Sequence, residues 1–328
     1  MVFGPCGGVR SGGRCELAER PCPFVDAPLV RWDGPEPGAV GPDGLLGLMA
    51  ERPVVVTDLR VRPLDPTSVT EVASVLGRAS DAVLIGDHQS RHDLPPLLLA
   101  RMAADAGAWP WVTLSCRDRN GVVLASELEG LALVGAAGVH CVTGDGRGPG
   151  ARTNATQVFD LDSLRLVALA RSVGLVPSVA ATPAAPPLAL RPARVVEKQR
   201  AGAALCFVNH AGGPAAVARF VAAAREAGAT MPFVPCVPVF TDEGSAAVLA
   251  AFPGVSVDGR LVDRVLQASD PVEAGVAAAV EQALAMAAIV GVAGVDLSGA
   301  ATSGPEHESA AIMAEVGRRL LDHWDRSR

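Results

Sequence analysis

The stretch that decides the fold is TLSCRDRNGVVLASELEGLALVGAAGVHCVTGD, residues 113–145. Its first apolar run predicts a buried strand over 111–115, and the polar loop CRDRN follows that strand. Leucines at positions 124, 128, 131 and 133 then predict a helix over 122–134. A second apolar, β-branched run over 139–143 predicts another strand. The segment is therefore a strand–helix–strand unit.

The same alternation extends in both directions from this unit. Apolar runs predict eight strands, at 54–57, 82–85, 111–115, 139–143, 175–179, 203–208, 231–235 and 289–295. Stretches such as 214–227 and 246–251 predict helices, and a last helix over 305–325 has Ser303 as its N-cap. Eight strands alternating with helices indicate a (β/α)8 TIM barrel. A doubly wound sheet would carry glycines after its first strand, and VVVTDLRVRP has none.

The composition is that of a folded protein with a large core. The 328 residues are 49% hydrophobic and 19% charged, which excludes disorder as the main state. The net charge of −7 argues against a nucleic-acid partner. Residues 1–50 are rich in Cys, Gly and Pro and have little periodicity. We therefore expect an irregular N-terminal extension over 1–50 and a barrel over 51–328.

The sequence favours a cytoplasmic protein without a membrane partner. The first 20 residues lack the apolar run of a signal peptide. The longest apolar stretch, 283–295, is shorter than the ~18 residues that a membrane span needs. Cysteines at 116, 141, 206 and 236 fall in strand-like runs, which is typical of buried, reduced thiols.

Polar residues follow nearly every predicted strand. In a (β/α)8 barrel, functional side chains stand at the carboxyl-terminal strand ends and on the loops beyond them. These positions hold Asp58; Gly86, Asp87 and His88; Ser115 to Asn120; Thr143, Gly144 and Asp145; Asn209 and His210; and Thr241, Asp242 and Glu243. Three carboxylates, Asp58, Asp145 and Asp118, would then surround one opening. Burial and like charge there raise carboxyl pKa values enough for acid catalysis.

These motifs resemble the methylenetetrahydrofolate reductase family. The family has HLTCRDRN in its third strand and LxGD in its fourth, and this chain has TLSCRDRN (113–120) and VTGD (142–145). DAVLIGDH (81–88), VFDLDSLRLV (158–167) and EKQRAGAAL (197–205) extend the resemblance, which covers roughly residues 53–300. It implies an oxidoreductase of one-carbon metabolism acting on CH–NH. FAD would pass hydride from NAD(P)H to the methylene (iminium) carbon of a tetrahydrofolate.

The resemblance also implies roles for individual residues. Asp58 matches the family's catalytic Glu and would protonate the folate, while Asp145 matches the flavin-facing aspartate that favours the cationic iminium. Asn209 replaces the Gln that pairs with the pterin, and His210 beside it would also contact substrate. The implied cofactor contacts are Gly86, Thr113, Ser115, Arg117, Asp118, Gly144, Asp145 and Lys198.

Two departures from the family leave the reaction open. Thr113 replaces the flavin-side His, and AATPAAPPLALRPAR (180–194) lacks the aromatic and acidic residues that hold the dinucleotide. Lys198 keeps the cation that contacts pyrophosphate, and Arg191 or Arg194 can add to it. A deazaflavin or no flavin are therefore alternatives to FAD. A flavin-free folate-binding one-carbon or methyl transferase or demethylase, and a non-catalytic partner subunit, are alternatives to a reductase. Because members of this family tend to form oligomers, the resemblance implies a homo-oligomer.

GPCGGVRSGGRCELAERPC (4–22) resembles a cysteine-rich module that accompanies reductases of this family. Cys6, Cys15 and Cys22 could supply thiolates to zinc or an iron–sulfur cluster. Their spacings of eight and six residues are not the paired spacing of ordinary zinc modules. The alternative is a small loop packed over the barrel.

Each candidate also has an ordinary structural explanation. Asp145 can be a helix N-cap, and Asp58 can be an ion-pair partner of Arg60. Arg117 and Asp118 can form a salt bridge that shapes their loop. His88 and His210 can be loop histidines without a catalytic role.

Overall fold

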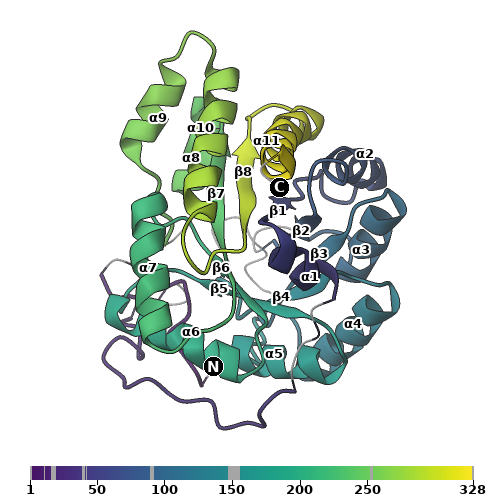
Figure 1. Cartoon of the computed structure of the whole chain (residues 1–328). Coiled ribbons are helices and arrows are strands. Elements are labelled where there is room, and N and C mark those ends of the chain that lie inside the picture. Colours follow the sequence, from purple (N-terminus) through teal and green to yellow (C-terminus); the bar gives the residue numbers. More distant parts are fainter. Residues whose placement is uncertain are drawn as a thin grey trace.

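The computed structural model describes residues 2–10, 12–15, 20–38, 41, 43–88, 92–146, 156–251 and 254–326. Eight parallel strands pair in chain order, and β1 closes against β8 (Figure 1). They are β1 (Val54–Asp58), β2 (Ala82–Ile85), β3 (Pro110–Ser115), β4 (Gly138–Val142), β5 (Pro177–Ala181), β6 (Leu205–Val208), β7 (Phe233–Phe240) and β8 (Gly294–Ala301). The predicted (β/α)8 barrel is therefore confirmed.

Helices connect the strands, and all of them except α1 lie around the outside of the barrel (Figure 1). They are α1 (Gly44–Glu51), α2 (Pro66–Leu76), α3 (Pro96–Asp105), α4 (Gly121–Leu133), α5 (Ser163–Ser172), α6 (Arg191–Arg200), α7 (Pro214–Glu226), α8 (Glu243–Ala250), α9 (Gly259–Leu266), α10 (Pro271–Ala287) and α11 (Glu306–Arg326). Asp65, Asn120, Asp162 and Asp270 accept backbone N–H bonds as N-caps, which explains why several of these helices begin where they do. Within the described ranges, no helix has the length and apolar character needed to cross a membrane.

Strand β8 begins later than the sequence predicts. Residues 289–293 form the turn after α10, where Gly291 takes a φ of 97°. The strand itself, GVDLSGAA, has few β-branched residues, so its signal is weak. It forms because Val54–Thr57 of β1 pairs along one of its edges and Cys236–Pro238 of β7 along the other. The predicted strand, 289–295, therefore starts about five residues too early, because β8 begins at Gly294.

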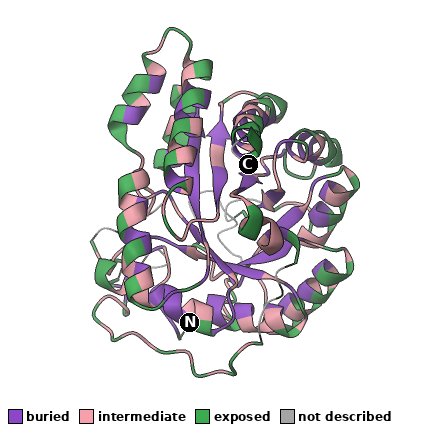
Figure 2. Ribbon diagram, in the orientation of Figure 1, coloured by how far each residue is buried: buried purple, intermediate pink, exposed green. Residues whose placement is uncertain are grey.

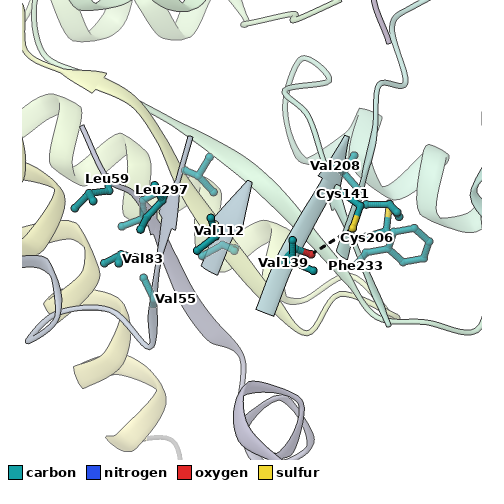
Figure 3. Close-up of a cluster of buried hydrophobic side chains, with 14 of the residues drawn as sticks. Val55, Leu59, Val83, Val112, Val139, Cys141, Cys206, Val208, Phe233 and Leu297 are labelled. Carbon is teal, nitrogen blue, oxygen red and sulfur yellow. Dashed lines mark hydrogen bonds between the residues drawn. The ribbon is translucent and has the colours of Figure 1, made fainter. Parts of the chain in front are cut away.

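Alternating strand residues build two separate layers of the core. Val55, Val83, Val112, Val139 and Leu297 belong to the buried cluster that joins the strands to the helices (Figure 3). The strands are almost entirely buried (Figure 2). Because successive side chains point to opposite faces, the residues between them fill the barrel interior.

The extension contacts both ends of the barrel. Leu45 of α1 packs with Val54 and Trp111, and so α1 covers the amino-terminal end. Residues 2–7 lie at the other end. There the amides of Val2 and Phe3 donate to Asp162.

Gly317 offers a direct test of the packing between α11 and the segment after α2. A Cβ at this position would lie 2.1 Å from the carbonyl oxygen of Ala79. We expect Gly317→Ala to lower the free energy of unfolding by about 1–3 kcal/mol, because the backbone of Ala79 has to move. Urea denaturation measures this. Gly259→Ala in α9, where a Cβ meets nothing within 4 Å, is the matched control. An equal effect in both variants would contradict the proposed clash.

Candidate functional site

A cavity of about 270 Å³ opens at the carboxyl-terminal end of the barrel. Strands β3 to β5, the loops after β2, β4 and β6, helix α6 and residues 4–7 form its walls. Of the predicted site residues, the structure places Thr113, Ser115, Arg117, Gly144, Asp145, Lys198 and Asn209 on this lining. It therefore brings together residues from the ends of β3, β4 and β6 and from helix α6.

Four other predicted residues lie outside the lining. Gly86 is exposed next to Asp87, which does line the cavity. Asp118 forms a salt bridge with Arg117 without lining the cavity itself. Asp58 is the last residue of β1, a strand that contributes no residue to the lining. His210 lines a separate void of about 10 Å³ between β7 and the segment around Ser256. Burial lowers the pKa of His210 to about 4, which keeps its imidazole neutral at neutral pH.

The CRDRN loop is held by charged hydrogen bonds. Asp87 accepts from the amide and the hydroxyl of Ser115, at 3.1 and 2.7 Å, and from Arg119 at 2.6 Å. Arg117, only 2% exposed, donates to Asp118 at 2.9 Å. The salt bridge expected as the structural alternative for Arg117 and Asp118 is therefore present, and it also fixes the Arg117 guanidinium at the cavity.

Gly144 and Asp145 bring the backbone of the β4 loop close to β3. Gly144 has a φ of 92°, and a Cβ there would lie 2.9 Å from the Cβ of Ser115. Any larger residue would therefore push the loop away. Burial raises the pKa of Asp145, and the charge of Arg117 opposes that shift. The next described helix, α5, is capped by Asp162 and not by Asp145.

One face of α6 supplies positive charge to the cavity. Arg191, Arg194 and Lys198 are spaced three and four residues apart, which places them on one side of the helix. Arg191 donates to the carbonyl oxygens of residues 185, 5 and 186, and Lys198 donates to Ala180. Burial, with the charge of Arg194, lowers the pKa of Lys198 to about 7.

His140 and Asn209 provide neutral polar groups. His140 is 7% exposed, contacts the Ser178 hydroxyl at 2.8 Å, and has its pKa lowered to about 3 by burial and by Lys198. The Asn209 side chain donates to Thr182 at 3.3 Å. The sequence analysis did not select His140, although its place two residues before Val142 on β4 puts both on the same, inward face.

A second group of titratable side chains lies on the opposite side of the barrel. The Cys236 thiol donates to Asp296 Oδ2 at 3.3 Å, while Asp58 accepts from the Gly299 amide at 3.4 Å. Burial raises the pKa of Asp58 to about 6; burial and the charge of Asp58 raise that of Asp296 far more. Arg60 donates to carbonyl oxygens of residues 300, 302 and 304, so the structure shows no Asp58–Arg60 ion pair.

Asp296 was missed at the sequence level. A carboxylate within the apolar run GVDLSGAA was the available signal, because a buried strand rarely contains an unpaired charge.

The three N-terminal cysteines are spread over a compact segment. Cys6 is partly exposed at the cavity, Cys15 pairs in a short bridge with Val9, and Cys22 is buried. None of them forms a disulfide. Across the part of the chain that the structure describes, no three His, Cys, Asp or Glu residues form a group that could hold a metal ion. Zinc or an iron–sulfur cluster at these cysteines stays a prediction. The four strand cysteines are all buried, as expected.

Comparison with known proteins supports the fold but assigns the chain to no family. No protein-family model and no curated protein matches this chain. An uncharacterized protein from Clostridium thermocellum that binds two copies of 5-methyl-5,6,7,8-tetrahydrofolic acid is 11% identical, with a TM-score of 0.56 over 83% of this chain and 98% of that one. The coenzyme F420 dependent tetrahydromethanopterin reductase from Methanopyrus kandleri is 13% identical, with a TM-score of 0.51 over 83% and 99%. Both are distant structural neighbours of this barrel.

Proposed function

We propose that this protein binds a tetrahydrofolate-type pterin at the carboxyl-terminal opening of the barrel and reduces its one-carbon unit, as methylenetetrahydrofolate reductases do. The observation that carries the proposal is the shared cavity of Asp145, Asn209 and Lys198, which come from three different segments. Two distant neighbours, one that binds a methyltetrahydrofolate and one that is a tetrahydromethanopterin reductase, support the ligand class.

The cavity has the polar groups that a pterin needs. The Asn209 amide offers both a donor and an acceptor to the edge of the ring. A cavity of about 270 Å³ suits the ring system, with the tail projecting outward. His140 lines the inner wall, and its lowered pKa keeps it neutral at neutral pH, so it places no positive charge beside the pterin.

The chemistry we propose is hydride addition to an iminium ion. Protonation of a folate nitrogen opens the imidazolidine ring and leaves a cationic CH2=N group, and hydride addition at its carbon gives the methyl group. Asp145 would stabilise the cation with its carboxylate. Asp58 lies outside the cavity lining, so it stays the proposed proton donor only for a folate that extends across the opening to the end of β1. Burial raises its pKa to about 6, which lets it hold and release a proton near neutral pH.

The described walls do not fit a whole flavin dinucleotide. Pockets for drug-sized ligands measure about 300–1,000 Å³, and FAD is larger than such ligands, whereas this cavity measures about 270 Å³. Residues 4–7 occupy one wall, and no Phe or Trp lines the cavity to stack on a flavin. We therefore propose a hydride donor that inserts only its ring, either a reduced nicotinamide or a reduced deazaflavin. The volume argues against the whole dinucleotide and not against a flavin ring, which is as large as a deazaflavin ring.

Product analysis tests the proposal. The purified protein is incubated with methylenetetrahydrofolate and, separately, with NADH, NADPH or a reduced deazaflavin, each labelled with deuterium at the transferred position. The expected product is 5-methyltetrahydrofolate carrying one deuterium. Failure of the protein to bind any tetrahydrofolate would contradict the proposal.

A second candidate is a flavin-free enzyme that transfers or removes a folate-bound methyl group. The observation that favours it is the poor fit of FAD to the cavity. Tight binding of 5-methyltetrahydrofolate, without reduction of the methylene compound by any of the three donors, would select it. A non-catalytic partner subunit would bind neither compound.

Asn209→Ala tests the pterin contact. We expect this variant to weaken tetrahydrofolate binding about tenfold, because it removes hydrogen bonds worth about 1–2 kcal/mol. Isothermal titration calorimetry measures the change. Gln267→Ala, an exposed amide after α9, is the matched control and should bind as the wild type does. Unchanged affinity in Asn209→Ala would place the pterin elsewhere.

A further inference from the structure

We propose that the imidazole of His140 is held as the Nε2–H tautomer and that this N–H donates a hydrogen bond to the 4-oxo group of the pterin. The inference rests on the proposed function, because its ligand is the tetrahydrofolate-type pterin, and it adds a residue that selects this ligand. Neither the sequence pattern nor the family resemblance assigned a role to His140.

His140 lies on the inward face of β4. Its neighbours Val139 and Cys141 belong to the buried cluster between the strands and the helices, so the His140 side chain points the opposite way, into the barrel. It lines the cavity and is 7% exposed. The ring of Phe207 packs against it edge to face, with 5.0 Å between the ring centroids and 74° between the ring planes. This packing limits the rotation of the imidazole.

The hydrogen bonds of Ser178 decide which ring nitrogen of His140 carries the hydrogen. Ser178 Oγ lies 2.8 Å from both Trp111 Nε1 and His140 Nδ1, and 3.4 Å from the carbonyl oxygen of Val139. Trp111 can only donate, and the hydroxyl has a single hydrogen to give. If Nδ1 carried a hydrogen, the hydroxyl would be left with the contact to Val139, which is longer than the about 2.5–3.0 Å of O–H···O bonds. The hydroxyl therefore donates to Nδ1.

Nε2 is then the N–H group that His140 offers to the cavity. Burial and the positive charge of Lys198 lower the pKa of His140 to about 3, so the ring is neutral and has one N–H. Among the described residues none makes a hydrogen bond with Nε2, and Nε2 is not one of the enclosed polar atoms that lack a partner. It therefore faces the open cavity, where a ligand can reach it.

A neutral N–H donor selects a hydrogen-bond acceptor of the ligand. In a reduced pterin the carbonyl oxygen at C4 is the strongest acceptor of the ring, whereas a 4-amino group in its place is a donor. A site built around a donor rejects a second donor, because both groups then stay unpaired.

The positions of His140 and Asn209 fit the two sides of one ring system. They belong to β4 and to the end of β6, the two strands that flank β5, so roughly 10 Å separates their backbones. A bicyclic ring between them can meet Asn209 with one edge and His140 with its 4-oxo group.

Binding of two ligands to variants of the full chain tests the contact. Isothermal titration calorimetry compares 5-methyltetrahydrofolate with its 4-amino counterpart. We expect the wild type to bind the 4-oxo compound about tenfold more tightly, and His140→Leu to lose this preference by weakening binding of the 4-oxo compound alone. His140→Gln should retain most of the affinity, because its amide can place an N–H near the position of Nε2. His307→Leu, at an exposed position of α11, is the matched control.

Three results would overturn the contact. They are a wild type without preference for the 4-oxo compound, equal losses for both compounds in His140→Leu, and a loss in His140→Gln as large as in His140→Leu. Circular dichroism confirms that each variant is folded. If His140→Leu is not, the preferences of the wild type and of His140→Gln decide.

Nitrogen-15 NMR tests the tautomer without any ligand. The full chain is labelled in its histidines, and the signals of His140 are those that disappear in His140→Gln. We expect a hydrogen on Nε2 and no titration of His140 between about pH 5 and 9. A hydrogen on Nδ1, or an imidazolium at pH 7, would overturn the proposal. A protein that has the Nε2–H tautomer but binds no tetrahydrofolate would instead contradict the proposed function, which keeps the two failures apart.

Discussion

Asp296→Asn is expected to raise the free energy of unfolding at pH 8, by about 1.4 kcal/mol for each unit by which folding raises the pKa of Asp296 up to pH 8, and to make it less dependent on pH. Asp296 is 1% exposed, and its Oδ1 has no hydrogen-bond partner among the described residues. At pH 8 the wild type must either keep a proton on this carboxyl or bury its charge beside Asp58. The amide is neutral at every pH and avoids both costs.

The sign of the pH dependence follows from the direction of the shifts. Burial raises the pKa of both carboxyls in the folded state, to about 6 for Asp58 and further for Asp296. Between pH 4 and these values the folded state binds more protons than the unfolded state. The wild type should therefore lose stability as the pH rises from 4 through 6 and beyond. Asp296→Asn should lose less over the same range.

Urea denaturation from pH 4 to 9 measures both effects. Asp263→Asn, an exposed aspartate on α9, is the matched control and should leave the profile unchanged. A wild-type stability that climbs steadily with pH from 4 to 8, or a destabilised Asp296→Asn protein at pH 8, would show that the carboxyl is ionised and well solvated.

Asp145→Asn is expected to lower the rate of methylenetetrahydrofolate reduction about 100- to 1,000-fold. The variant keeps the size of the side chain and removes the negative charge that would stabilise the iminium ion. Loss of one preorganised electrostatic contact costs about 2.7–4 kcal/mol in the transition state. Because the effect belongs to the transition state, KM should change much less than kcat.

Steady-state kinetics with the best of the three hydride donors checks this expectation. Asp263→Asn again provides the control for the same chemical change at a distance from the cavity. Binding of 5-methyltetrahydrofolate, which has no iminium cation, should be nearly unchanged in Asp145→Asn. A wild-type kcat in this variant would remove Asp145 from the catalytic group.

Regular patterns made the barrel predictable. Residues 111–115, the helix after Asn120 and residues 139–143 form a strand–helix–strand unit close to the predicted positions, because apolar periodicity and the Asn120 cap agree with the final packing. Strand β8 was misplaced, since pairing with its two neighbours, and not local preference, determines where it begins. Tertiary context overrides strand propensity in such cases.

The cavity was only partly predictable. Strand-end positions indicated Ser115, Asp145 and Asn209, because the barrel topology brings such ends together. No local pattern says that Arg191 reaches Pro5, or that residues 4–7 form a wall. Those facts depend on how segments nearly 190 residues apart pack against each other. Asp58 was expected beside Asp145, but it is not among the residues that line the cavity.

The wall formed by residues 4–7 is independent of the strand ladder. All eight strands pair in a closed ring without it. Arg191 donates to the carbonyl oxygen of Pro5, and the preceding residues Val2 and Phe3 donate their amides to Asp162, with Phe3 buried in the core. The size of the binding chamber is thus set partly by a peptide that no strand pairing requires. Substitutions confined to residues 4–7, which leave the buried Phe3 in place, would enlarge the chamber without breaking the strand ring that holds the reacting groups.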